Sequence, residues 1–171
     1  MAARGGYFAI TADQKARLMA LTTGADRAEY LNEIFDEVPY QDLDKAWYTI
    51  HRALANYPSD PYGLSDEMDA QYASYPLKLA IYGGQDINVD GDDGWILRLI
   101  EPHQIADLVQ AMEGLDEESL KQKYWASNSL ESHCEYGEDD LEYTLGYFEE
   151  ARDFLKQMAG TGRTVIFLAD Q

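Results

Sequence analysis

The chain has 171 residues, of which 46% are apolar, so it is long enough for one domain with a sizeable core and is not a disordered tail. Its 13 basic and 32 acidic residues give a net charge of −19. Such a charge repels nucleic-acid phosphates and anionic membrane surfaces and attracts cations or a basic protein, although solubility alone also favours an acidic surface.

The single cysteine, Cys134, excludes an intramolecular disulfide and suits a reducing compartment. The N-terminal residues contain no apolar run of signal-peptide length, and no run in the chain approaches the ~20 apolar residues of a membrane span. We therefore expect a cytoplasmic protein with no membrane partner.

The first quarter of the chain predicts a strand followed by two helices. Gly5–Ile10 is short, aromatic and apolar, as expected of an opening β-strand. A capping-box pattern, with threonine at the N-cap and glutamine three residues later, then opens a helix over Thr11–Thr22. A second helix is expected from Asp26 to Val38, and Pro39 stops it.

The segment Gln41–Tyr57 predicts a third helix, which Pro58 ends because the residue before proline avoids helical geometry. Asp42 or Asp44 is positioned to cap its first turn. The apolar side chains recur at i, i+4, i+7 and i+11, the spacing of one helical face. They are Leu43, Trp47, Ile50 and Leu54.

The middle of the chain is less regular. Residues 56–76 hold three of the five prolines and are interpreted as a long surface excursion. Leu77–Tyr82 and Trp95–Ile100 have strand-like composition, and the residues from Gly83 to Gly94 that join them are rich in turn formers.

The last third predicts three helices and a final strand. The first helix opens with Pro102 at its first position and ends at Gly114, and the second is capped by Asp116 and ends near Trp125. The acidic stretch 126–140 leads into a third helix that ends at Ala159. The last predicted element is Thr164–Ala169, a continuous apolar run typical of a strand buried on both faces.

This order of elements lacks the regular β-α-β alternation of a doubly wound sheet. It favours the α+β class, with a small mixed or antiparallel sheet of about four strands flanked by about six helices. Neither an internal repeat nor a linker divides the chain, so residues 1–171 are expected to form a single domain.

Two short motifs are weak candidates for metal binding. Residues Asp86–Gly91 match the first half of a calcium loop, but its twelfth position, normally a bidentate glutamate, is Leu97. An Asp-Gly turn between two strands explains the same residues. His133 and Cys134 are too few for a zinc site. No nucleotide-binding or nucleophile motif is present, so we expect no catalytic residue, metal or cofactor.

The strongest candidate for a binding site is the helix that carries Trp47 and His51, which are separated by one turn, with Asp44 two turns before His51. Tyr7, on a neighbouring strand, completes the candidate set. A lone histidine beside an apolar stripe is usually a hydrogen-bonded structural residue. The alternative is a small pocket in which His51 is the polar group.

Several of these segments resemble the YfbM-like bacterial family of unknown function. The residues that carry the resemblance are Gly6–Ile10, Leu43–Trp47 with His51 and Leu54, Gly83-Gly84, the helix after Pro102, Leu115–Leu120, and Phe148 with Gly162 and the final strand. The resemblance spans nearly the whole chain and implies a small α+β cytoplasmic bacterial protein. It implies no reaction.

Two functions are therefore compatible with the sequence. The first is a non-enzymatic binding protein whose acidic surface meets a basic protein partner, including a toxin-neutralising role. The second is a small-molecule-binding protein or enzyme with a pocket near Asp44, Trp47 and His51.

Overall fold

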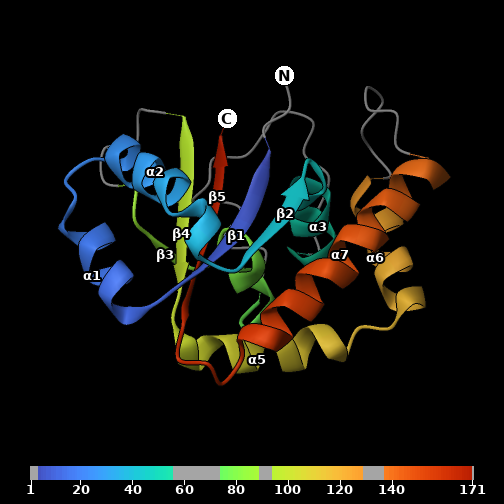
Figure 1. Ribbon diagram of the computed structural model, residues 1–171. Helices are drawn as coiled ribbons and strands as arrows, with labels where there is room; N and C mark the ends of the chain where they lie inside the picture. The colour runs from blue at the N-terminus through green and yellow to red at the C-terminus, as the bar shows by residue number, and fades with distance from the viewer. Residues whose placement is uncertain (1–3, 56–73, 89–93, 129–136, 171) are drawn as a thin grey trace.

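The computed structural model describes residues 4–55, 74–88, 94–128 and 137–170. These residues form one antiparallel sheet of five strands in the order β2-β1-β5-β4-β3, with helices on both faces (Figure 1). The predicted α+β class is confirmed, with one strand more than the four expected. The strands are β1 (Gly5–Ile10), β2 (Tyr40–Asp44), β3 (Gln85–Asp86), β4 (Trp95–Ile100) and β5 (Thr164–Asp170).

Six α-helices lie in the part of the chain that the structure describes, together with two short 3-10 helices, η1 and η2. None of these helices combines the length and the apolar sequence that a bilayer span requires. The α-helices are α1 (Ala12–Ala20), α2 (Gly24–Glu33), α3 (Ala46–Ala55), α5 (Pro102–Glu113), α6 (Glu117–Asn128) and α7 (Glu138–Met158); the 3-10 helices are η1 (Phe35–Glu37) and η2 (Leu77–Ala80).

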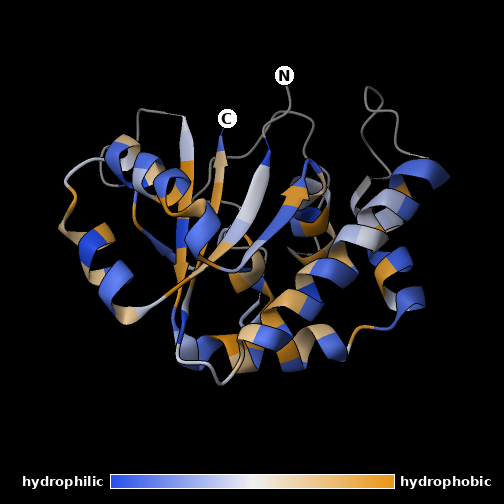
Figure 2. Ribbon diagram, in the orientation of Figure 1, coloured by the Kyte–Doolittle hydropathy of each residue, from blue (hydrophilic) through white to orange (hydrophobic). Residues whose placement is uncertain are grey.

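The core lies in two layers, one on each face of the sheet. Val165, Phe167 and Ala169 of β5 pack under α3, α5, α6 and α7, whereas Ile166 and Leu168 pack under α1 and α2. Strand β5 is central, because it pairs with β1 and β4, and the helices on the two sides of the sheet bury both of its faces. This burial explains its uninterrupted apolar sequence, and Figure 2 shows apolar residues along the central strands and hydrophilic residues recurring along α7.

Helices α1, α5 and α6 begin where the sequence predicts them. The Gln14 N–H donates to Thr11 Oγ1 at 3.3 Å, and the Thr11 N–H donates back to Gln14 Oε1 at 2.9 Å. Asp116 accepts from the Ser119 N–H at 2.8 Å at the start of α6, and Pro102 is the first residue of α5. These caps satisfy N–H groups that the helix itself leaves unpaired.

The second helix differs from its predicted bounds. It begins at Gly24 because Thr23, rather than Asp26, is the cap: Thr23 Oγ1 accepts from the Asp26 N–H at 3.0 Å. It ends at Glu33, and the residues up to Val38 include the 3-10 helix η1 instead of a continued α-helix.

The predicted helix over Gln41–Tyr57 is wrong in its first turn. Residues Tyr40–Asp44 form β2 and pair with β1, and α3 starts only at Ala46. Asp44 has φ of 43°, a left-handed conformation that aspartate tolerates better than most residues and that separates the strand from the helix. Leu43 is buried as expected, but it belongs to a strand rather than to a helix.

The predicted strand Leu77–Tyr82 is also wrong, because residues Leu77–Ala80 form η2. Leu79, Ala80 and Ile81 are buried beneath α3 and α5, and a short buried apolar run has no periodicity that separates strand from helix. Two strands that were not predicted, β2 and the two-residue strand β3, take the place of this one, so the sheet has five strands rather than four. Of the interval 56–76 interpreted as a surface excursion, residues 56–73 lie outside the described residues.

Candidate functional site

Three of the four predicted site residues lie together in the core. The Tyr7 and Trp47 rings both contact Phe167, with centroid distances of 6.0 and 5.7 Å. Trp47 and His51 both contact the Tyr82 ring, with centroid distances of 6.1 and 4.6 Å. The helical spacing of Trp47 and His51 thus places both on the inner face of α3, where they join one aromatic cluster.

Tyr7 has a structural hydrogen bond in this cluster. Its side chain is fully buried, and its hydroxyl donates to the Ala80 carbonyl oxygen at 2.7 Å. Burial raises the pKa of the Tyr7 hydroxyl well above its ordinary value, so the group stays protonated. Tyr7 therefore ties β1 to η2.

His51 is buried, with 3% of its surface exposed. Burial, with a smaller effect of the Arg52 charge, lowers the pKa of the imidazole from 6.5 to about 3. Its Nε2 atom has no hydrogen-bond partner among the described residues, although buried polar atoms are normally paired. His51 is thus a neutral imidazole with one unsatisfied nitrogen.

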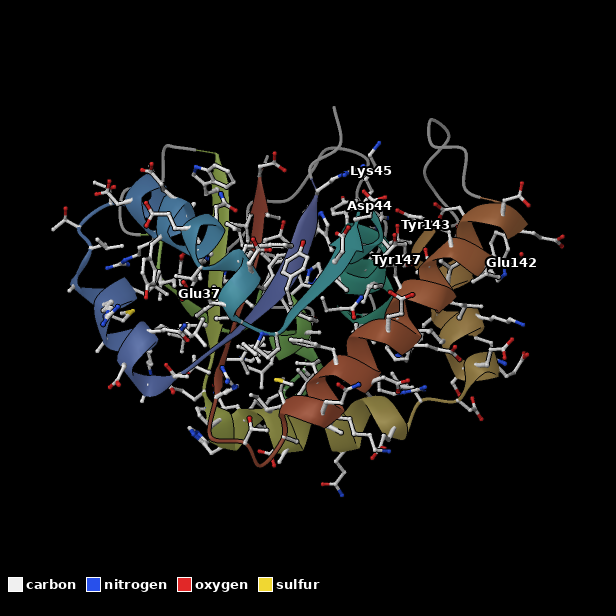
Figure 3. All side chains as sticks on the ribbon, viewed as in Figure 1. Glu37, Asp44, Lys45, Glu142, Tyr143 and Tyr147 are labelled. Carbon is white, nitrogen blue, oxygen red and sulfur yellow. The ribbon has the colours of Figure 1, made fainter. Side chains whose placement is uncertain are left out.

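Asp44 lies apart from this cluster, on the surface where β2 ends. Its Oδ2 atom accepts a hydrogen bond from the Tyr143 hydroxyl of α7 at 2.8 Å, and its Oδ1 atom lies 3.1 Å from Arg4 Nε. The same Tyr143 oxygen accepts from the Lys45 N–H at 3.4 Å. Figure 3 shows Asp44, Lys45, Tyr143 and Tyr147 grouped at this junction of β2 and α7. Asp44 therefore does not share a helical face with His51.

Two tyrosines of α7 form the helical side of this junction. Tyr143 and Tyr147, one turn apart, make an edge-on contact with ring centroids 4.8 Å apart. Partial burial and the hydrogen bond to Asp44 raise the pKa of Tyr143, and burial followed by the charges of Asp44 and Asp42 raises that of Tyr147. Both hydroxyls therefore remain protonated beside carboxylates, and that of Tyr143 donates to Asp44.

A groove of about 320 Å³ continues this surface along the edge of the sheet. Gln41 spans it, because its Nε2 atom donates to Glu150 Oε2 at 2.8 Å and to the Asp42 carbonyl at 2.9 Å. The groove lining comprises Pro39, Tyr40 and Gln41 of the β2 side and Glu150, Asp153, Phe154, Gln157 and Met158 of α7.

We call the surface that joins this groove and the Asp44 junction the β2–α7 face. Each of its residues has a polar or aromatic side chain and lies at the boundary between the strand and the helix. They are Tyr40, Gln41, Asp42 and Asp44 of β2 and Tyr143, Tyr147, Glu150 and Asp153 of α7.

The described residues contain no group of three or more histidine, cysteine, aspartate or glutamate side chains that could hold a metal ion. In the half calcium loop, the Asp86 carboxylate pairs with Arg98 and accepts from the Asn88 N–H at 2.9 Å. Leu97 lies in strand β4, as expected from the sequence. Residues 89–93 of this loop, and the His133-Cys134 pair, lie outside the described residues.

Sequence reasoning missed most of the β2–α7 face. It named Asp44 but not Tyr143, Tyr147 or Glu150, because Asp44 and Tyr143 are 99 residues apart and only the packing of α7 against β2 brings them together. The abundance of tyrosine, 13 residues, was a signal for such a surface but did not locate it.

Comparison with known proteins identifies the family. A family described as "Domain of unknown function (DUF1877)" matches residues 1–168. A solved structure described as a protein of unknown function, YfbM from Escherichia coli, is 16% identical, with a TM-score of 0.69 over 97% of this chain and 99% of that chain. Comparison with functionally curated proteins gives no match. The structural likeness at this identity shows a shared fold, and the family match over nearly the whole length shows that the chain belongs to the DUF1877 family.

Proposed function

We propose that this protein is a non-enzymatic binding protein that holds a basic protein partner on the β2–α7 face. The observation that carries the proposal is the juxtaposition of carboxylates and tyrosine rings across two elements. Asp42 and Glu150 are exposed on this face, close enough to Tyr147 for their charges to raise its pKa, and Asp153 is exposed farther along α7 in the groove. Carboxylates pair with lysine and arginine, and tyrosine rings attract the same cations while they bury apolar area.

The overall charge supports the same class of partner. A net charge of −19 on 171 residues attracts a cationic protein at long range and speeds the encounter, whereas short-range contacts on one face determine which partner stays. The same field repels nucleic-acid phosphates, so nucleic acid is not part of the proposal. The single cysteine suits a reducing compartment, and we place the function in the cytoplasm.

The test compares two variants that lose the same charge at different places. D42N/E150Q/D153N neutralises the β2–α7 face, and the amide that replaces the Asp42 carboxylate keeps an oxygen that can accept from the Asp44 N–H. D13N/E29Q/E33Q neutralises three exposed carboxylates of α1 and α2 and is the matched control. A basic protein captured from the source cell, identified and purified, is then titrated against each variant by calorimetry.

The face variant should weaken binding about tenfold or more, and the control should change it by no more than about twofold. Equal weakening by both variants would show that only the total charge matters and would contradict the proposed face. If the captured partner is a toxin, co-expression of the wild-type chain should restore growth and co-expression of the face variant should not.

A second candidate function is favoured by one observation, that the Nε2 atom of His51 has no hydrogen-bond partner in the part of the chain that the structure describes. A small molecule that hydrogen-bonds to this nitrogen would remove the cost of burying it unpaired, about 1–3 kcal/mol. A pocket near Trp47 and His51 therefore stays a prediction. A ligand-induced shift of the His51 ring resonances in an NMR screen, together with loss of binding of the same ligand to H51F, would support it.

A further inference from the structure

The outer edge of β2 is open in the part of the chain that the structure describes. Among the described strands, β2 is the terminal one and pairs only with β1. The Ala9 N–H donates to the Pro39 carbonyl at 2.9 Å, so these two residues form a hydrogen-bonded pair. Because such pairs alternate along an antiparallel ladder, the backbone groups of Tyr40 and Asp42 point away from β1. The edge therefore presents the N–H and C=O groups of these two residues to another strand.

Gln41 covers part of this edge. Its side-chain amide donates to the Asp42 carbonyl and to Glu150, which is where the N–H of an added strand would be placed. A side chain that caps an edge carbonyl is one way in which proteins limit unwanted strand pairing. Here it also holds a carboxylate next to the open edge, so the site combines backbone pairing groups with negative charge.

We infer that the outer edge of β2 binds an extended segment of a partner protein that carries lysine or arginine at alternate positions. Side chains of an added strand alternate between the two faces of the sheet, so every second one faces the groove lined by Glu150 and Asp153 of α7. Alternate residues of a strand are about 6.8 Å apart, which is close to the 5–6 Å between residues i and i+3 of a helix.

Charge repulsion disfavours the main alternative occupant of this edge, which is the β2 strand of a second copy of the chain. The second copy would bring its own Asp42 and Asp44 on β2, with Glu150 on α7, next to the same carboxylates of the first copy, and like charges across an interface cost several kcal/mol. A basic segment instead neutralises them. The inference rests on the proposed function and names the conformation and charge pattern of the partner segment.

The test uses synthetic peptides of alternating threonine and lysine, titrated by calorimetry at about 50 mM salt. One isomer is N-methylated on every threonine and the other on every lysine. Successive N–H groups of a strand point to opposite sides, so only one isomer retains the groups that pair with β2. We expect one isomer to bind like the parent peptide and the other about tenfold more weakly, from the loss of two or more hydrogen bonds.

Protein variants test the same site from the other side. E150Q/D153N should weaken the parent peptide about tenfold, whereas E142Q/E149Q, which removes the same charge from α7 outside the groove, should change its affinity by no more than about twofold (Figure 3 shows Glu142 directed away from β2). Q41A removes the amide that competes for the Asp42 carbonyl and should tighten binding.

The outcomes separate this inference from the proposed function. If both N-methyl isomers bind equally while E150Q/D153N still weakens them, the groove binds cations without strand addition, and the inference fails although the proposed function stands. If the wild-type protein binds none of the peptides and sediments as a dimer, the occupant of the edge is a second copy, and the inference is overturned. A basic partner whose affinity changes with neither D42N/E150Q/D153N nor E150Q/D153N would overturn the proposed function itself.

Discussion

The burial of His51 predicts a specific dependence of stability on pH. The folded-state pKa of about 3 lies below the ordinary value of 6.5, so between these values the unfolded chain binds a proton that the folded chain does not. The contribution of His51 to the unfolding free energy is therefore fully present above pH 6.5 and is lost as the pH falls toward the folded-state pKa. Each pH unit below 6.5 costs about 1.4 kcal/mol, or about 2 kcal/mol at pH 5.

The variant H51F removes this titration while it keeps an aromatic ring against Tyr82, whose centroid lies 4.6 Å from that of His51. We expect the difference in unfolding free energy between H51F and the wild type to move by about 2 kcal/mol in favour of H51F between pH 7.5 and pH 5. Carboxylates also titrate in this range, but they are common to both proteins and cancel in the difference. Urea unfolding monitored by circular dichroism at each pH supplies the values.

Replacement of the exposed His103 by phenylalanine controls for the loss of a histidine elsewhere in the chain. If the difference in unfolding free energy between H51F and the wild type stays constant within about 0.5 kcal/mol from pH 7.5 to pH 5, the reasoning is refuted. It would mean that His51 takes up a proton in the folded state, as a histidine in a wet pocket does. The same experiment therefore bears on the second candidate function.

Three further predictions concern packing, and each is checked by chemical unfolding. Y7F should lower the unfolding free energy by about 1–3 kcal/mol, because it leaves the buried Ala80 carbonyl without the hydroxyl that now donates to it. G84A should cost about 1–3 kcal/mol, because the added Cβ would lie 2.6 Å from the Leu99 backbone oxygen of β4; a smaller loss would show that β4 can shift. G146A should instead raise stability by about 0.5–1 kcal/mol, because Gly146 is exposed, no described residue lies within 4 Å of the added Cβ, and alanine favours the helix; a loss of stability there would contradict this open environment.

The candidate site illustrates how far sequence pattern reaches. The spacing of Trp47 and His51 predicted a common helical face, and the structure confirms it, with both side chains directed into the core. The same pattern extended the helix back over Asp44, which is wrong, since Asp44 ends a strand. Periodicity reports which side chains are buried, but Leu43 is equally buried in either conformation.

The sequence by itself determined the features that depend on neighbouring residues. The capping box at Thr11, proline at the start of α5, the cap at Asp116 and the apolar run of β5 each act within a few residues, so each was visible in the chain. Only the tertiary structure decided that Tyr40–Asp44 becomes an edge strand, because that choice depends on pairing with β1 and on the contact with α7 about a hundred residues later. The β2–α7 face, where the function is proposed, is a product of those long-range contacts.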